Sequence, residues 1–75
     1  MLYLVDREKF HNLRLLKKMT IEELAEKSKV SANTIQEIEY GTRKSVRERT
    51  LFDLARAFGM EPFEFEKAVI SSQEK

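Results

Sequence analysis

Apolar side chains recur every three or four residues along most of the chain, which is the spacing of helices that bury one face. In the first stripe, Phe10 and Leu13 are followed at helical spacing by Leu16 or Met19. The remaining stripes contain Leu24, Ala25, Ile35, Ile38, Leu51, Leu54, Ala55, Phe58, Phe65, Ala68 and Val69. The pattern therefore predicts five helices.

Polar residues mark where the first three helices begin and end. Asp6 is suited to cap a first helix that ends among residues 17–18, where two lysines favour a helix C-terminus. Thr20–Glu23 has the pattern of a capping box and opens a short second helix. Ser31 is suited to cap the third helix, and Gly41 is suited to the left-handed residue that ends it.

The last two helices carry similar signals. Ser45–Glu48 has the pattern of a second capping box, and Gly59 is expected to end the helix that follows. Glu61 and Pro62 fit the start of a fifth helix with proline in its first turn. The polar residues 72–75 are expected to fray.

Residues that interrupt helices or form tight hairpins are scarce in this chain. The 75 residues include two glycines, one proline and no Asn-Gly or Asp-Gly pair. An apolar content of 41% is sufficient for one small core, and a second domain does not fit. The sequence thus predicts an all-α fold, a compact five-helix bundle in which residues 1–75 form a single domain.

The apolar run from Leu2 to Val5 lies outside the helical pattern and is expected to form an N-terminal arm of residues 1–5. Such an arm packs either on a partner subunit or on the final helix of its own domain, next to Phe63. Packing on its own core is favoured, because a small domain recruits every apolar group.

Composition excludes several classes of protein. The chain has no cysteine and only one histidine, His11, so neither a disulfide scaffold nor a metal site nor another cofactor is expected. No apolar run approaches the roughly 20 residues that span a bilayer, which favours a cytoplasmic protein with no membrane contact. His11 has no paired base, so we expect no catalytic residue and no small-molecule substrate.

Positive charge is concentrated in two segments, residues 1–19, with five basic and two acidic groups, and the loop of residues 41–49. The net charge is only +1, but residues 41–49 carry four basic groups and one acidic group, whereas residues 20–40 carry two basic and five acidic groups. A basic segment beside the N-terminus of the fourth helix is suited to binding phosphate. The alternative is a charged loop that contacts only solvent.

The segment from Thr20 to Gly41 has the layout of a helix-turn-helix, two short helices that cross closely at the small residue Ala25. Between about Phe10 and Phe65 the chain resembles the Cro/phage-repressor helix-turn-helix family. The resemblance is carried by Leu24-Ala25, Val30-Ser31, Thr34-Ile35, Ile38-Glu39, Gly41, Thr50-Leu51 and Leu54-Ala55. It implies a lambda-repressor-like bundle that binds duplex DNA, usually as a two-fold dimer.

Around the third helix, Ile35 and Ile38 lie on one side, and Asn33, Glu37 and Tyr40 lie on the other. The resemblance implies that three residues face base edges in the major groove: Ala32, Asn33 and Glu37. Asparagine pairs with adenine, glutamate accepts from the cytosine amino group, and an alanine methyl contacts the thymine methyl. The residues expected to contact the DNA backbone are Thr34, Gln36, Arg43, Lys44, Arg47 and Arg49.

The resemblance also implies an internal ion pair between Arg14 and Glu39, which would orient the first helix against the third. Three features depart from the family pattern. Ile21 stands where a glutamine commonly clamps a phosphate, and Lys29 replaces the usual turn glycine. The loop from residue 41 to 50 is about one residue longer than usual and lacks its common proline.

These features predict a regulator of transcription, a repressor that binds double-stranded DNA as a homodimer and inserts the helix at about 32–40 in the major groove. It is not expected to be an enzyme. The alternative is a protein-interaction module, a co-regulator or antitoxin-like partner with the same fold, which the weak net charge and Ile21 favour.

Overall fold

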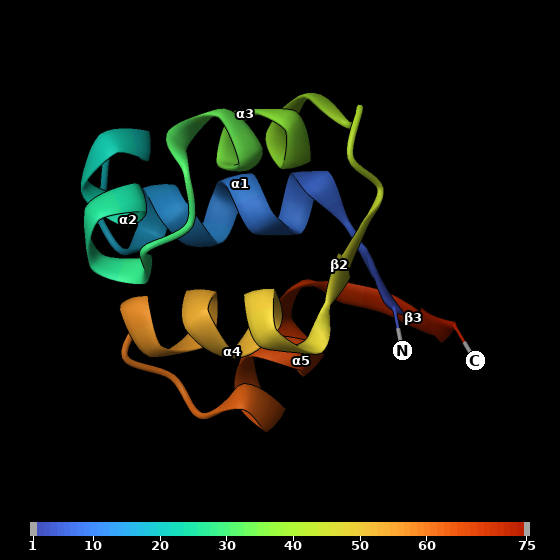
Figure 1. Cartoon of the computed structure of the whole chain (residues 1–75). Coiled ribbons are helices and arrows are strands. Elements are labelled where there is room, and N and C mark those ends of the chain that lie inside the picture. Colours follow the sequence, from blue (N-terminus) through green and yellow to red (C-terminus); the bar gives the residue numbers. More distant parts are fainter. Residues whose placement is uncertain (1, 75) are drawn as a thin grey trace.

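The structure is a computed structural model that describes residues 2–74, with side chains to residue 71, as five helices and a small sheet (Figure 1). The elements in chain order are β1 (Leu2–Val5), α1 (Arg7–Leu16), α2 (Ile21–Ser28), α3 (Ala32–Tyr40), β2 (Ser45–Arg47), α4 (Glu48–Ala57), α5 (Pro62–Val69) and β3 (Ile70–Glu74). The predicted helical bundle is confirmed, and the sheet is an addition to it.

Local capping explains where most of the helices begin. The Asp6 carboxylate accepts hydrogen bonds from the amides of Glu8 and Lys9 in the first turn of α1, at 3.1 Å each. Thr20 and Glu23 form the expected reciprocal capping box at the start of α2. Ser31 accepts from the Thr34 amide at 3.1 Å, and Gly41 ends α3 with a φ of 85°. Each of these caps was predicted, because a cap depends on only a few neighbouring residues.

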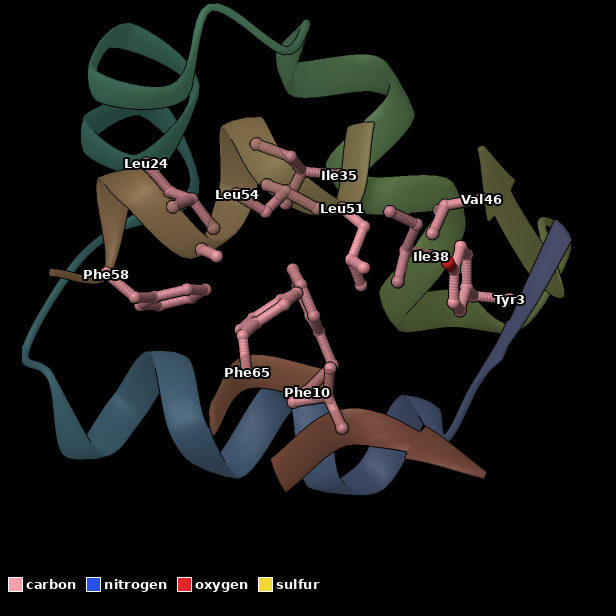
Figure 2. Packing of buried hydrophobic residues seen from close by; sticks show 12 residues of the cluster. Tyr3, Phe10, Leu24, Ile35, Ile38, Val46, Leu51, Leu54, Phe58 and Phe65 are labelled. Carbon is pink, nitrogen blue, oxygen red and sulfur yellow. The ribbon is translucent and has the colours of Figure 1, made fainter. Parts of the chain in front are cut away.

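Three phenylalanines, from α1, from the residue after α4 and from α5, form the centre of the core (Figure 2). Phe10 of α1 meets Phe58 and Phe65 edge-on, with ring centroids 6.0 and 6.3 Å apart. Phe58 and Phe65 stack at 5.6 Å, which joins the end of α4 to α5. Leu24 and Ile35 are fully buried above these rings, so both helices of the helix-turn-helix rest on one core. Leu16, by contrast, is 75% exposed and faces solvent, whereas Met19 packs against the core.

The sheet corrects two sequence-based expectations. Ser45–Glu48 is not a capping box: Ser45–Arg47 is strand β2, and α4 begins at Glu48 without a side-chain cap. The N-terminal arm is strand β1, which lies between β2 and β3 and pairs with both in antiparallel fashion. Tyr3 of β1 and its cross-strand partner Val46 are buried, so the arm packs on its own core, as was favoured.

The C-terminal segment also differs from expectation. Residues 70–74, which include most of the expected frayed tail, form β3 against β1, and Ser71 donates to the Leu4 carbonyl at 3.1 Å. Residues 1 and 75 lie outside the described residues. No helix in the described part of the chain is long and apolar enough to cross a membrane.

Candidate nucleic-acid interface

Helix α3 buries one side and exposes the other. Ile35 and Ile38 are almost completely buried, whereas Asn33 and Tyr40 are exposed, Tyr40 at 74%. The other side chains expected to contact DNA from this helix are partly exposed: Ala32, Thr34, Gln36 and Glu37. The polar side predicted from the helical period is therefore accessible along the length of α3.

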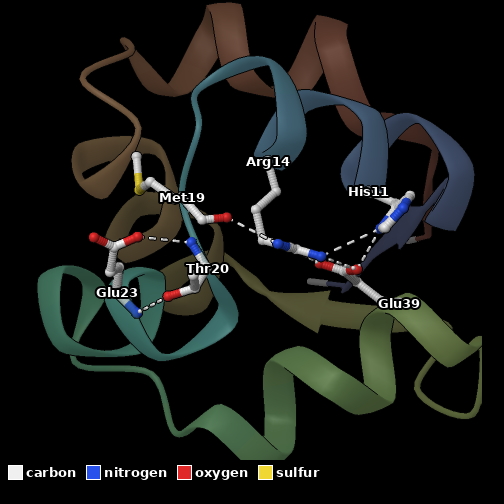
Figure 3. Close-up of polar contacts among 6 residues, drawn as sticks. All are labelled: His11, Arg14, Met19, Thr20, Glu23 and Glu39. Atoms are coloured by element: carbon white, nitrogen blue, oxygen red, sulfur yellow. Dashed lines mark hydrogen bonds and ion pairs between the residues drawn. The ribbon is translucent and has the colours of Figure 1, made fainter.

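The inner side of α3 is tied to α1 by an ion pair (Figure 3). Arg14 donates to both carboxylate oxygens of Glu39, from Nη2 to Oε1 at 3.0 Å and from Nε to Oε2. A third Arg14 nitrogen donates to the Met19 carbonyl at 2.8 Å. His11 Nδ1 lies 2.6 Å from Glu39 Oε1, a contact that the sequence did not predict. The orientation of α3 on the bundle is thus fixed by several polar contacts at one carboxylate.

The contacts of this ion pair shift the pKa values of Glu39 and Arg14. Burial alone would raise the pKa of Glu39, but the hydrogen bonds from Arg14 and His11 outweigh burial and lower the pKa below its usual value of 4.5. The hydrogen bond to Glu39 raises the pKa of Arg14. Glu39 is therefore held as a carboxylate, and its charge is compensated within the protein.

The loop after α3 folds back onto the outer side of the helix. The amides of Gly41, Thr42 and Arg43 all donate to the Glu37 carbonyl, at 3.0 to 3.1 Å. Arg43 then donates from Nε and Nη2 to one carboxylate oxygen of Glu37, Oε1, at 3.2 and 3.0 Å. The predicted base-reading carboxylate and a predicted phosphate-binding cation are thus joined in one pair, with Oε2 of Glu37 outside these contacts.

Several residues predicted to contact the DNA backbone line a hollow of about 180 Å³ beside α3. Its lining residues are Leu2, Thr34, Arg43, Ser45, Val46, Arg47 and Thr50. The Thr34 hydroxyl accepts from the Ser31 hydroxyl at 2.9 Å, which leaves its own hydrogen available to an external oxygen. The first turn of α4 opens here, and its free amides favour an anion.

The structure does not bring all the predicted cations to this hollow. Lys44 lines a different groove, on the other side of Arg43, and Arg49 is exposed on α4 outside the hollow. Conversely, Leu2 and Thr50 line the hollow although neither was predicted as a contact. Leu2 pairs with Arg47 across the sheet, and cross-strand partners share a face, so only the strand register reveals its place.

At the start of the helix-turn-helix, Ile21 is partly buried against the core, so it contributes packing where the family has a polar clamp. Lys29 adopts the left-handed conformation with a φ of 65°, as its position in the turn required. The turn between α2 and α3 therefore keeps its shape without glycine.

The chemistry available on this face is recognition of a ligand. Within residues 2–71, whose side chains the structure describes, no three His, Cys, Asp or Glu side chains are grouped so that they could hold a metal ion. The face instead offers an amide, a carboxylate with a free oxygen, guanidinium groups and a helix N-terminus. These groups bind phosphates and hydrogen-bond to base edges.

Comparison with known proteins agrees with this geometry. A helix-turn-helix family model matches residues 10–65, most of the chain, from the first core phenylalanine of α1 to the last one of α5. A search of curated proteins and a search of solved structures each found no match. The chain belongs to the Cro/repressor-like helix-turn-helix family, whose members are DNA-binding regulators.

Proposed function

We propose that this protein is a sequence-specific repressor of transcription that binds duplex DNA as a homodimer, with α3 in the major groove. The observation that carries the proposal is the outer side of α3, where Asn33 and Glu37 are accessible beside a hollow lined by guanidinium groups. Two subunits related by a two-fold axis would read half-sites about 34 Å apart.

In this proposal Arg43 positions Glu37 for base reading. Both guanidinium contacts fall on Oε1, so Oε2 is free to accept a hydrogen bond from a cytosine amino group. The same guanidinium keeps the carboxylate charge partly compensated near the DNA phosphates. Asn33, exposed in the first turn of α3, supplies the amide that pairs with adenine.

Arg47, Thr34 and the first turn of α4 hold a phosphate in the hollow. These contacts set the register of α3 on the duplex but carry no sequence information. Since Ile21 supplies no clamp, the phosphate contacts of one subunit are few, and tight binding requires both subunits of the dimer.

The test is fluorescence anisotropy with a duplex selected from a randomised pool and with a random duplex. Asn33→Ala and Glu37→Ala are expected to weaken binding to the selected duplex about tenfold or more and to leave the random duplex little changed. Asn12→Ala and Glu8→Ala are matched controls, because they remove the same side chains from the exposed surface of α1. Unchanged sequence preference in both α3 variants would show that α3 does not read bases.

Arg47→Ala separates the backbone contact from base reading. It should weaken binding to both duplexes alike and reduce the slope of log affinity against log salt concentration by about 1. Analytical ultracentrifugation of the protein with a selected duplex tests the dimer, for which two protein chains per duplex are expected. A single chain per duplex at saturation would overturn the homodimer.

A second candidate function is binding of another protein. It is favoured by large apolar side chains on the surface, Leu16 at 75%, Phe63 at 60% and Leu15 at 53% exposure. Duplex affinity that stays negligible at 20 to 50 mM salt, where phosphate contacts are strongest, would favour this candidate over the repressor.

A further inference from the structure

A second groove, of about 580 Å³, lies on the other side of Arg43 from the hollow beside α3. It is bounded by β1, the end of α3 and the segment that leads from α3 to β2, which runs beside β1 in Figure 1. Its lining residues are Leu4, Val5, Arg7, Ile38, Tyr40, Gly41, Arg43, Lys44 and Ser71. Its volume lies in the range of small-molecule sites.

The groove combines an apolar floor with cations and contains no acidic lining residue. Leu4 and Val5 supply aliphatic surface, with the buried Ile38 behind them, and Arg7, Arg43 and Lys44 supply three positive charges. Within residues 2–71, neither Arg7 nor Lys44 forms an ion pair with a carboxylate. Among the residues that line the groove, an anion would therefore meet two cations, Arg7 and Lys44, that no described carboxylate pairs.

The walls of the groove are held by backbone contacts. The Val5 amide donates to the Lys44 carbonyl at 2.9 Å, which fixes the loop to β1. Arg7 donates to the Tyr40 carbonyl at 3.2 Å, and its side chain passes so close to Gly41 that an added Cβ would lie 3.0 Å from its Cδ. Gly41 thus allows Arg7 to lie across the end of α3, and hydrogen bonds hold Arg7 and Arg43 in place before any ligand arrives.

We propose that this groove binds a small organic anion with an apolar body, such as a carboxylate that carries an aromatic or aliphatic chain. The anionic group lies among Arg7, Arg43 and Lys44, and the apolar body lies on Leu4 and Val5. A bare phosphate lacks the apolar contact, and a neutral molecule of the same shape lacks the charge.

Occupancy of the groove is linked to the DNA-facing surface through Arg43, a consequence that rests on the proposed function. Arg43 lines both the groove and the hollow and donates to Glu37. A carboxylate in the groove competes with Glu37 for the Arg43 guanidinium. The ligand therefore changes how Glu37 is presented to bases, and by reciprocity the duplex changes the affinity for the ligand.

The experiment titrates the 75-residue chain without DNA by two-dimensional NMR, with 4-phenylbutyrate as the probe. A ligand of this size is expected to bind with a dissociation constant on the order of 1 mM and to shift the amides of Val5, Gly41 and Lys44. Inorganic phosphate and 4-phenylbutanol should each bind at least about fivefold more weakly. The proposal would be overturned if phosphate or 4-phenylbutanol bound as tightly as 4-phenylbutyrate. It would also be overturned if the chemical shift changes were confined to residues outside the groove.

Lys44→Gln should weaken the binding of 4-phenylbutyrate about fivefold. Its matched control is Lys67→Gln, which removes an ammonium that lies over the Phe63 ring on α5, outside the groove. Equal loss in both variants would indicate a general charge effect and would contradict the assigned site. The wild-type comparison of the three probes decides the proposal even if a variant is unstable.

The link to DNA is measured separately, by anisotropy in saturating 4-phenylbutyrate. The preference for a selected over a random duplex should fall at least about twofold, since Arg43 is shared. An unchanged preference would refute the link. If the protein binds no duplex at all, the proposed function fails, whereas the titration without DNA still stands or falls by its own result.

Discussion

Helix α3 contributes two glutamates, two residues apart, to two arginine pairs that differ mainly in burial. Glu39 pairs with Arg14, and their side chains are 7% and 11% exposed. Glu37 pairs with Arg43, and their side chains are 38% and 47% exposed. Similar chemistry therefore occurs on the inner and outer sides of one short helix.

The difference in burial indicates different roles. In the inner pair each charge has lost most of its water, so either partner alone would be left uncompensated inside the protein. In the outer pair water or an external ion can replace either partner at little cost. The inner pair is suited to fixing the orientation of α3, and the outer pair is suited to exchanging partners when a ligand binds.

The largest expected effect is on stability when each arginine is replaced. Arg14→Met should lower the free energy of unfolding by about 3 kcal/mol, because it leaves the Glu39 carboxylate buried with only His11 beside it. Arg43→Met is the matched control and should cost at most about 1 kcal/mol. Urea unfolding at pH 7 measures both.

If Arg14→Met and Arg43→Met lost equal free energies of unfolding, the two ion pairs would not differ in role. A second check is the double variant Arg14→Met with Glu39→Met, which removes both buried charges. It should be more stable than Arg14→Met alone, because no unpaired charge remains inside the protein. A double variant that is less stable would mean that the ion pair itself, and not the penalty for breaking it, dominates.

The helix caps could be predicted from the sequence, whereas the strands could not. The caps at Asp6, Thr20 and Ser31 were predictable because each depends on atoms within three residues. Ser45 carries the same local signal, but it pairs instead with Leu4, about forty residues away in the chain, and this long-range contact overrides the local preference. The strands were missed because short strands far apart in sequence give no hairpin signal.

At the site, the helical period was enough to predict which α3 side chains face outward, Asn33 and Glu37 among them. The period could not predict the contact between Glu37 and Arg43. That contact requires the left-handed Gly41 and three amides that return to one carbonyl, which is a property of the loop conformation. The helical period also could not predict that Leu2, paired with Arg47 across the sheet, lines the hollow, or that Lys44 lines the neighbouring groove.

A smaller effect on the free energy of unfolding is expected when the pH is lowered. The pKa of Glu39 is lower in the folded protein than its ordinary 4.5, so its stabilisation is complete above about pH 4.5 and is lost as the pH falls through the folded value. Glu39→Gln cannot titrate. We expect the wild type to be more stable than this variant by about 2 kcal/mol at pH 6, and the difference to shrink toward pH 3.

The measurement is urea unfolding at several pH values between 6 and 3. Glu37→Gln is the control from the outer side of the same helix, and it should differ little from the wild type throughout, because an exposed pair contributes little stability. A gap between the wild type and Glu39→Gln that stays constant with pH would show that the carboxylate charge of Glu39 does not stabilise the fold.

The smallest expected effect is the response of the two pairs to salt, measured by double-mutant cycles with alanine at both positions of each pair. The outer cycle should give a coupling of about 0.5 kcal/mol at low salt and almost none at 1 M, because mobile ions screen exposed charges. The inner cycle should keep most of its coupling at 1 M, because salt does not reach a pair that is 7% and 11% exposed. If salt abolished both couplings, the inner pair would be as accessible as the outer one, and the orientation of α3 would depend mainly on the packing of Ile35 and Ile38.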